Sequence, residues 1–334
     1  MTTAQTQPPI RRVGWSGRDG RRLSKLATHL TAVAVAIAGL CLVPLLGLSS
    51  NGMNLVDLWL VYSVSALGYL WVLGLAGRYA FCHTFMMAIG GYSAAWADAR
   101  GAAFLVALGV ALATSALAAI VVGALMWRVR QFYFAIGTLA VGEIGFTVLS
   151  RTSEFTGTNG NVHGISYPSL FGHSFVGDEQ IFYLFLGALA IMLVLTLLLI
   201  NAPVGRDLTA ARETPEVART CGIPVRRLHF TLFVLGSAVG GLAGALVTYW
   251  VGFIGVDSFG LDLSIGLLLI VIMGGLRSPI GIVLATAFYV FLPAALSGLS
   301  EYMPMIFGAV LLVTIMLFPN GIAAGLKLKR RSAA

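Results

Sequence analysis

"AAFLVALGVALATSALAAIVVGALMW", residues 102–127, contains no charged side chain in 26 consecutive positions. An α-helix rises about 1.5 Å per residue, so about 20 apolar residues are enough to cross the hydrocarbon core of a bilayer. Lipid offers no hydrogen-bond partners to backbone N–H and C=O groups, and a spanning segment must therefore satisfy them within a helix. The stretch predicts a membrane-spanning helix and sets the fold class.

The rest of the chain has the same character. Its 334 residues are 58% apolar and only 10% charged, with a mean hydropathy of +0.91, which leaves too little polar surface to cover a soluble globule. The sequence therefore predicts an all-α polytopic membrane protein with about ten transmembrane helices, two of them short or discontinuous. The other long apolar runs lie near 26–48, 55–76, 132–150, 181–201, 229–252, 280–299 and 303–319, and the two short ones near 80–97 and 263–276.

Two basic tails flank the apolar region. Residues 1–25 carry six Lys or Arg side chains and are expected to form a disordered cytoplasmic tail. The first apolar run is too long for the h-region of a secretory signal, about 7–15 residues, so we interpret it as an uncleaved anchor. Residues 26–319 form the predicted transmembrane domain, and residues 320–334 a second basic cytoplasmic tail.

The distribution of charge predicts the orientation, because cytoplasmic loops of membrane proteins are rich in Lys and Arg. With the N-terminal tail inside and ten crossings, nineteen of the 21 basic residues fall on the inner side, and only Arg100 and Arg151 fall outside. Both termini are therefore expected in the cytoplasm. The same asymmetry explains the net charge of +8 without a nucleic-acid partner.

Cysteine usage predicts no metal site. Cys41, Cys82 and Cys221 are odd in number and widely spaced, and they lie in apolar runs or on the inner side. Neither a disulfide framework nor a metal-ligand spacing is present. They are expected to be inert packing residues.

The longest inner loop, residues 203–228, includes eight charged side chains between positions 205 and 228. Thr214 suits an N-cap and Pro215 the first position of a helix, while Gly222 supplies a left-handed C-terminal residue. The pattern predicts a short helix over 215–221, preceded by a polar segment from Arg206 to Glu213. Such a loop is either a solvated connector or an element that docks into a groove of a soluble partner.

The stretch "GRDLTAARETPEVARTCGI" at 205–223 resembles the cytoplasmic coupling loop of LivM-type permeases of the branched-chain amino-acid ABC importer family. Further segments match that family in order over residues 50–322. Arg78 departs from the family, which usually has Gln there. The matching segments are "GLAGRYAFCHTFMMAIGGYSAA" (74–95), "YFAIGTLAVGEI" (133–144), "TGTNG" (156–160), "GGLAGAL" (240–246), "VIMGGLRSPIG" (271–281) and "LFPNGI" (317–322).

The resemblance implies a permease subunit of an ATP-driven importer in the bacterial cytoplasmic (inner) membrane. It implies a second homologous permease, two ATPase subunits and an extracytoplasmic solute-binding protein as partners, with branched-chain amino acids as the first expectation for cargo. No G-x-x-x-x-G-K-[ST] phosphate loop occurs in the chain, so ATP and Mg are expected in the partner subunits, and the chain itself is expected to be neither an enzyme nor a cofactor-binding protein. The residues expected to couple to the ATPase are Gly205, Arg206, Arg212, Glu213, Glu216, Ala218 and Gly222.

Four polar residues are candidates for the transport pathway: His83, Thr138, Glu143 and Asn159. A lipid-facing carboxylate at the depth of Glu143 costs about 2.5–3.5 kcal/mol on insertion scales, so Glu143 is expected to face protein or a water-filled cavity. It either lines the pathway or bonds neighbouring helices. His83 likewise either contacts the cargo or is a satisfied packing histidine.

The two short runs are the third and eighth of ten, which places them equivalently in two halves of five helices. An odd number per half predicts an inverted repeat, an arrangement in which discontinuous helices lie near the pathway. The outer segment 151–180 either folds over the mouth of the pathway and meets the binding protein, or is a flexible connector.

An ion-coupled secondary transporter or a channel for a small solute is the alternative function, since it would show similar helices and basic inner loops. Secondary carriers usually place several ionisable groups in the membrane, whereas this sequence places only Glu143 there securely. The cargo within small amino acids, urea, amides or organic acids is not determined by these residues.

Overall fold

The computed structural model describes residues 31, 33–46, 49–126, 129, 131–152, 156–157, 160–170, 173–175, 177–295, 305–306 and 308–309. Both predicted tails, most of the run at 303–319 and the pathway candidate Asn159 lie outside these residues. Residues 33–40 are helical within the first predicted run.

Helices coincide with the predicted apolar runs. Six helical segments among the described residues are long and apolar enough to cross a bilayer, which confirms an all-α polytopic membrane protein. Both short runs are helices: α11, with 14 residues, is one of these six together with the turn before it, and α3 has 16 residues. The bounds are α2 Ser50–Tyr69 with the π-helix η2 Leu70–Leu75, α3 His83–Asp98, α4 Phe104–Leu125, α5 Gln131–Arg151, α7 Asp178–Asn201, α10 Val225–Val251, α11 Leu261–Gly274 and α12 Pro279–Ala295, preceded by the 3-10 turn η1 Val43–Leu46.

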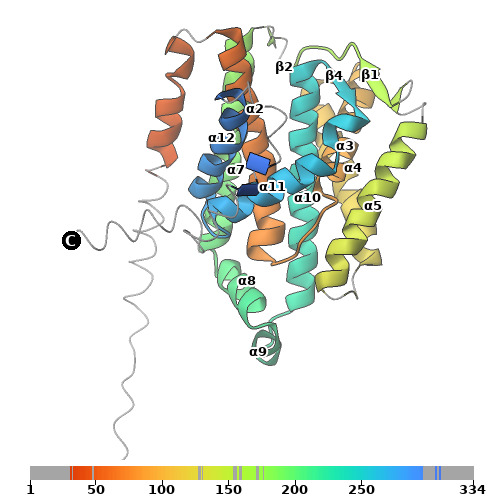
Figure 1. Cartoon of the computed structure of the whole chain (residues 1–334), viewed down its shortest axis with the longest axis vertical. Coiled ribbons are helices and arrows are strands. Elements are labelled where there is room, and N and C mark those ends of the chain that lie inside the picture. Colours follow the sequence, from red (N-terminus) through yellow and green to blue (C-terminus); the bar gives the residue numbers. More distant parts are fainter. Residues whose placement is uncertain are drawn as a thin grey trace, which may run out of the picture.

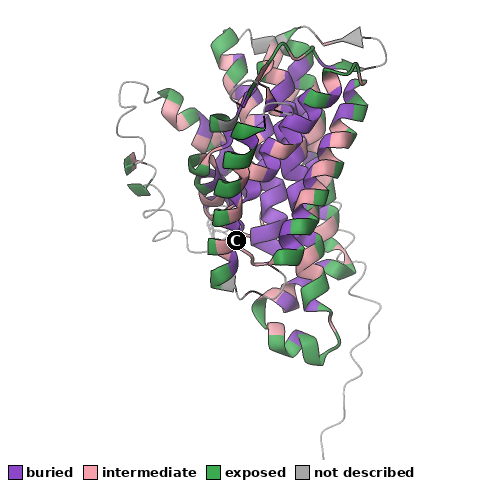
Figure 2. Cartoon of the chain, turned by 90° about the vertical axis from the view of Figure 1, so that its right-hand side faces the viewer, coloured by how far each residue is buried: buried purple, intermediate pink, exposed green. Residues whose placement is uncertain are grey.

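Helix α10 lies at the centre of the bundle and packs against α2, α3 and α4 (Figure 1). Glycines allow this close approach, as expected for helix packing in a membrane. A Cβ at Gly90 of α3 would meet the backbone of Gly241 on α10, and one at Gly68 of α2 would lie 3.0 Å from the carbonyl oxygen of Gly236. Figure 2 shows the buried residues as a column through the centre of the bundle.

Short strands cover the end of the bundle that the sequence places outside, although no strand was predicted. Strand β1 (Asn161–His163) pairs antiparallel with β4 (Phe253–Gly255), which directly follows α10. A second ladder joins β2 (Ser169–Leu170) to β3 (His173–Ser174), and the 3-10 turn η3 (Val256–Phe259) leads into α11.

Side chains from the helix ends hold this outer segment in place. Tyr92 of α3 donates a hydrogen bond to the carbonyl oxygen of Gly160, and the backbone N–H of Ser166 donates to Oδ2 of Asp98 at 2.9 Å. The described part of the segment 151–180 is therefore folded onto the bundle, which a flexible connector would not be.

Candidate functional site

Two short helices form a hairpin that projects from the bundle at the end opposite the strands (Figure 1). They are α8 (Pro203–Glu213) and α9 (Pro215–Thr220), which confirms the predicted short helix within one residue at its end. The polar segment from Arg206 to Glu213, for which no helix was predicted, belongs to α8. That segment is helical because Pro203 starts it and because Leu208 and Ala211, three residues apart, bury one face.

The chain turns sharply at Thr214 (φ −139°, ψ 71°), between the two helices. Thr214 occupies the predicted N-cap position of α9, but its side chain makes no capping hydrogen bond, so this part of the prediction was wrong. A capping residue usually has extended backbone angles. Ser49 has them (φ −61°, ψ 156°) and its hydroxyl accepts a bond from Gly52, whereas the ψ of Thr214 is far from that range.

Gly222 ends α9 as predicted, with a φ of +80°. The N–H of Ile223 donates to the carbonyl oxygen of Ala218 and the N–H of Gly222 to that of Arg219, each at 3.0 Å. This pair of bonds is the Schellman motif, which requires a left-handed residue at the position of Gly222. Ala218 packs with Ala211 and Val225 in a small apolar cluster that joins the hairpin to the start of α10.

Arg212 connects the hairpin to the interior of the bundle. Its Nη1 donates a 2.6 Å hydrogen bond to the carbonyl oxygen of Gly74, in the last turn of η2. Its side-chain carbons also pack against Gly77, where a Cβ would lie 3.1 Å from Cγ of Arg212 and where φ is +69°. Burial, together with the nearby positive charge of Arg277, lowers the pKa of Arg212. The guanidinium is thus partly withdrawn from water in order to hold the end of η2.

Glu213 makes a second connection, to the turn between α11 and α12. Its Oε1 lies 3.0 Å from Nη2 of Arg277. Both side chains are about half exposed, 46% for Arg277 and 63% for Glu213, so the attraction between them is screened by water. The last two residues of α8 therefore contact two separate parts of the membrane domain.

The seven predicted coupling residues divide into inner and outer sets. Gly205 and Ala218 are buried, and Gly205 faces the carbonyl oxygens of Leu199 and Ile200, so both position the hairpin. Arg212 and Glu213 contact the bundle, as described above. Arg206, Glu216 and Gly222 are exposed, and Glu216 forms a 2.9 Å ion pair with Arg219 one turn later on the outer face of α9.

His83 lies in the packed interior at the start of α3. It is 1% exposed, its Nε2 is 3.3 Å from Oγ of Ser65, and its ring centroid is 4.9 Å from that of Tyr69. A Cβ on Gly240 would meet the imidazole at 2.9 Å. His83 is thus packed between α2 and α10, but its Nδ1 has no hydrogen-bond partner among the described residues, so it is not the fully satisfied histidine of the packing alternative.

Thr138 joins α5 to the loop before α3. Its hydroxyl accepts a hydrogen bond from the N–H of Phe81 at 3.1 Å and donates to the carbonyl oxygen of Ala135 at 2.9 Å. The side chain is fully buried, and its two hydrogen bonds hold this loop against α5.

Glu143 lies on the exposed face of α5, together with Ala140, Ile144 and Thr147. The opposite face packs on the bundle through glycines, since a Cβ on Gly145 would meet the ring of Phe85. The expectation that Glu143 faces protein or a cavity is therefore not met within this chain. The helical period of the sequence does not by itself show which face of α5 packs on the bundle.

The sequence analysis missed two polar residues that the structure brings out. Asp57 is a second carboxylate inside a span, 1% exposed in the second turn of α2, and the signal was an acidic residue inside the apolar run 55–76. Cys221 is exposed at the end of α9, whereas Cys82 is buried and Cys41 half-buried. The expectation that all three thiols pack inside was thus wrong for Cys221.

Comparison with known proteins connects this architecture to a transport family. The family model described as "Branched-chain amino acid transport system / permease component" matches residues 52–318. The chain is 29% identical to the LivM permease protein of the high-affinity branched-chain amino acid transport system of Escherichia coli (strain K12), over 82% of this chain and 70% of that protein. It is 24% identical to the LivH permease protein of the same organism, over 80% of this chain and 93% of that protein. No solved structure matches the chain.

Proposed function

Because the chain belongs to the permease family of branched-chain amino acid transport systems, we propose that it is one permease subunit of an ATP-driven importer for branched-chain amino acids or related small polar solutes. The observation that carries this proposal is the projecting hairpin, which is tied to the membrane domain by Arg212. A protruding helix that is stopped at both ends and fixed to the bundle is suited to receive a movement from a soluble partner. The chain is a transport subunit and not an enzyme, and ATP with Mg binds to that partner.

The proposed assembly contains two ATPase subunits, a second homologous permease and a solute-binding protein on the outer side. The similarity to both LivM and LivH supports the second permease, because those names denote two permease proteins of one high-affinity branched-chain amino acid transport system. The distribution of Lys and Arg supports the bacterial cytoplasmic membrane with both termini inside. The folded strands at the opposite end offer a surface for the binding protein.

In the proposed mechanism, the outer face of α9 docks on the ATPase and α8 transmits its movement. Arg212 would pull on η2 through the carbonyl oxygen of Gly74, while Glu213 acts on the turn before α12 through Arg277. Packed helices change access by rigid-body movement rather than by continuous deformation. A hairpin that is linked to two sites would therefore move α2 and α12 together.

The proposed pathway lies beside Glu143, between the two permeases. Exposure of a carboxylate to lipid at this depth costs about 2.5–3.5 kcal/mol on insertion scales. The exposed face of α5 around Glu143 would avoid this cost against a second permease or a water-filled route. A carboxylate at that place also offers a counter-charge to the ammonium group of an amino acid.

The packing of the helices supports the inverted repeat as part of this proposal. Helix α3 packs on α4 and α10, and its proposed counterpart α11 packs on α12 and α2. Likewise α10 packs on α4, and α2 on α12. If α2 corresponds to α10, α3 to α11 and α4 to α12, each of these contacts has an observed counterpart when the two halves are exchanged. A two-fold relation in the membrane plane requires such counterparts.

The test is uptake of labelled leucine into vesicles that contain this chain, the second permease and the ATPase subunits, with the binding protein added outside. We expect uptake to require ATP inside and to persist when ion gradients are collapsed, with other branched-chain amino acids as competitors. Uptake driven by an ion gradient without ATP would instead establish the secondary transporter.

The docking step can be tested separately at Cys221, the exposed thiol of the hairpin. A membrane-impermeant maleimide applied from the cytoplasmic side should label Cys221, and bound ATPase subunits should protect it. The variant Cys221→Ser provides the background signal. Labelling only from the outer side, or unchanged labelling in the assembled transporter, would contradict the proposed orientation or docking.

A further inference from the structure

A basic cavity of about 250 Å³ lies between the hairpin and the membrane domain. Residues from the loop after η2, both hairpin helices and the start of α10 line it. Four arginines and one histidine are among them, and no acidic side chain among the described residues lines the cavity. The basic lining residues are Arg78, Arg212, Arg219, Arg226 and His229.

Several arginines of this cavity are held by contacts within the chain. Arg219 is paired with Glu216, and Arg78 and Arg212 each donate a hydrogen bond to a neutral carbonyl oxygen, that of Val129 and that of Gly74. Burial and the neighbouring charge of Arg226 lower the pKa of Arg78. Like charges that face one another at a half-buried site favour a bound anion.

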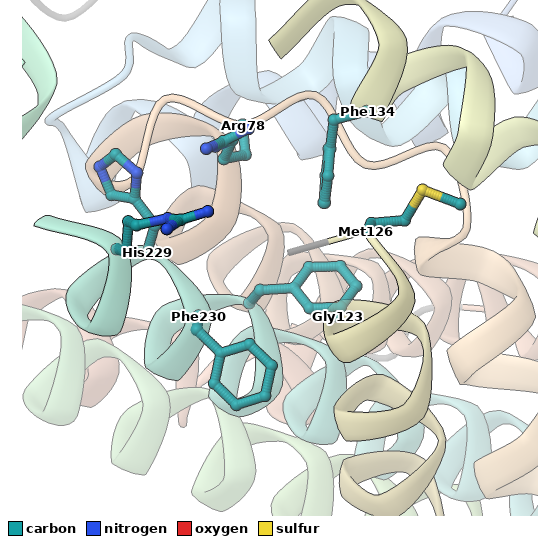
Figure 3. A pocket seen from close by; sticks show the side chains of 8 residues that line it. Arg78, Gly123, Met126, Phe134, His229 and Phe230 are labelled. Carbon is teal, nitrogen blue, oxygen red and sulfur yellow. The ribbon is translucent and has the colours of Figure 1, made fainter. Parts of the chain in front are cut away.

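An apolar crevice continues from this cavity. Arg78, Arg226 and His229 line both hollows, and the crevice itself, about 30 Å³, is otherwise lined by Gly123, Met126, Phe134, Phe230 and Phe233. In Figure 3, Arg78 and His229 lie on one side of the crevice, Phe134 and Met126 lie on the other, and Phe230 lies below them. The guanidinium of Arg78 lies 5.3 Å from the ring centroid of Phe134 and so connects the polar and apolar parts.

We propose that this composite site binds an anionic phospholipid, with its phosphate among Arg78, Arg226 and Arg212 and an acyl chain leaving along the aromatic crevice. Guanidinium groups suit a phosphate because they donate two parallel hydrogen bonds. Basic pockets between membrane helices on the headgroup side are recognised sites for such lipids. Leu125 and Phe132 are close in sequence to the lining residues Met126 and Phe134 and are 69% and 72% exposed, so they offer apolar surface for the rest of the acyl chain.

The chemistry of the site argues against two other occupants. A zwitterionic amino acid would bring an ammonium group into a cavity without a carboxylate to receive it. A carboxylate of a docked ATPase would approach the outer face of α9, where Val217, Thr220 and Cys221 are exposed, and none of these three lines the cavity. The bound lipid instead joins the inner side of the hairpin to the loop at Arg78.

The consequence concerns stability as well as binding. A ligand that binds only the folded state raises its apparent stability in proportion to the logarithm of its concentration over its dissociation constant. Bound lipid is thus expected to hold the hairpin against the membrane domain. The inference depends on the cavity alone and not on cargo, on energy source or on the direction of transport.

The test titrates the purified full chain in detergent with phosphatidylglycerol or with phosphatidylcholine of the same acyl composition. Retained lipid is counted by native mass spectrometry, and the thermal midpoint is followed by tryptophan fluorescence. We expect phosphatidylglycerol to bind at least about 10-fold more tightly and to raise the midpoint, since charge-assisted hydrogen bonds to phosphate are the strong ones. Equal binding of the two lipids would overturn the proposal, and this comparison needs no variant.

Variants then locate the site. Arg78→Gln and Arg226→Gln should each weaken phosphatidylglycerol binding by about 10-fold, whereas Arg227→Gln, an exposed neighbour outside the cavity, should change it less than about 2-fold. Unchanged binding by both cavity variants would overturn the assignment. So would displacement of the lipid by inorganic phosphate at equal concentration, or by the ATPase subunits, because these results assign the cavity to a free anion or to a partner carboxylate.

Discussion

Nη1 of Arg212, on the projecting hairpin, donates a hydrogen bond of 2.6 Å to the carbonyl oxygen of Gly74, which belongs to the last turn of a membrane helix. The bond connects residues that are far apart in the sequence and that lie on opposite sides of the junction between the hairpin and the bundle. It is shorter than the 3.0 Å contact between Glu213 and Arg277, the second polar link between the hairpin and the bundle described above.

Arg212→Gln should separate ATP hydrolysis from uptake. A hydrogen bond from a charged donor contributes about 1.5–3 kcal/mol, so its loss should lower the number of cargo molecules moved per ATP by about 10-fold or more. The measurement is the ratio of leucine uptake to phosphate release in reconstituted vesicles. Arg227→Gln, which is exposed at the start of α10, is the control, and an unchanged ratio for Arg212→Gln would count against transmission through Gly74.

Glu213 and Arg277 should behave as an exchangeable pair. Glu213→Arg and Arg277→Glu place like charges together and should each reduce coupling, while the double exchange should restore it. Because both side chains are about half exposed, the interaction energy from the double-mutant cycle should stay below about 1 kcal/mol and decrease at high salt. If the double variant is no better than the worse single variant, the two residues act separately.

Gly222→Val should weaken docking of the ATPase, because a β-branched residue at a φ of +80° is strained by about 1–3 kcal/mol. Gly222→Asn is the informative control, since Asn tolerates left-handed angles. Binding of the ATPase subunits to the solubilised complex should be lost for Val and largely kept for Asn. Equal binding by the two variants would show that the end of α9 does not matter for docking.

Glu143→Leu should lower uptake by at least about 10-fold without reducing the amount of chain in the membrane, because a leucine at the exposed face of α5 is compatible with lipid. Uptake by Glu143→Gln should lie between that of the unmodified chain and that of Glu143→Leu if the negative charge contributes. Glu179→Gln, an exposed carboxylate at the outer end of α7, is the matched control. Normal uptake by Glu143→Leu would remove α5 from the pathway, whereas loss of the second permease on purification would assign Glu143 to the subunit interface.

Gly90→Ala should destabilise the chain by about 1–3 kcal/mol, since the added methyl group would meet the backbone of Gly241 on α10. The same substitution at Gly109 of α4, where nothing lies within 4 Å, should be neutral or stabilising by up to about 1 kcal/mol. Thermal unfolding in one detergent compares the two. A similar midpoint for both variants would mean that α3 and α10 can separate freely.

The helices were predictable because lipid imposes one dominant constraint on them. The run at 102–127 became α4 (Phe104–Leu125) within two residues at each end, since backbone groups in lipid must bond within a helix. The hairpin was only half predictable. Capping residues identified α9, but α8 has few apolar positions, and its period of three, from Gly205 through Leu208 to Ala211, became meaningful only with its burial on the structure.

The candidate site was less predictable than the fold, because the sequence does not show which residues meet. Arg78 and Arg226 come from separate parts of the chain, and only tertiary packing brings them to one cavity. Thr138 was selected as a polar pathway candidate on α5, whereas its bond to the N–H of Phe81 depends on how α5 packs. For Glu143, the glycines of α5 indicated a packed face, whereas the direction of the carboxylate followed only from the structure.

Helix α10 runs without a break from the hairpin to strand β4, 27 residues or about 40 Å. A coupling between its two ends, where one exists, must act equally in both directions. If binding of the ATPase subunits changes the affinity of the chain for the ligand-loaded binding protein, then the binding protein must change the affinity of the chain for the ATPase subunits by the same factor. This reciprocity can be measured at equilibrium, without any turnover, from two titrations performed in opposite order.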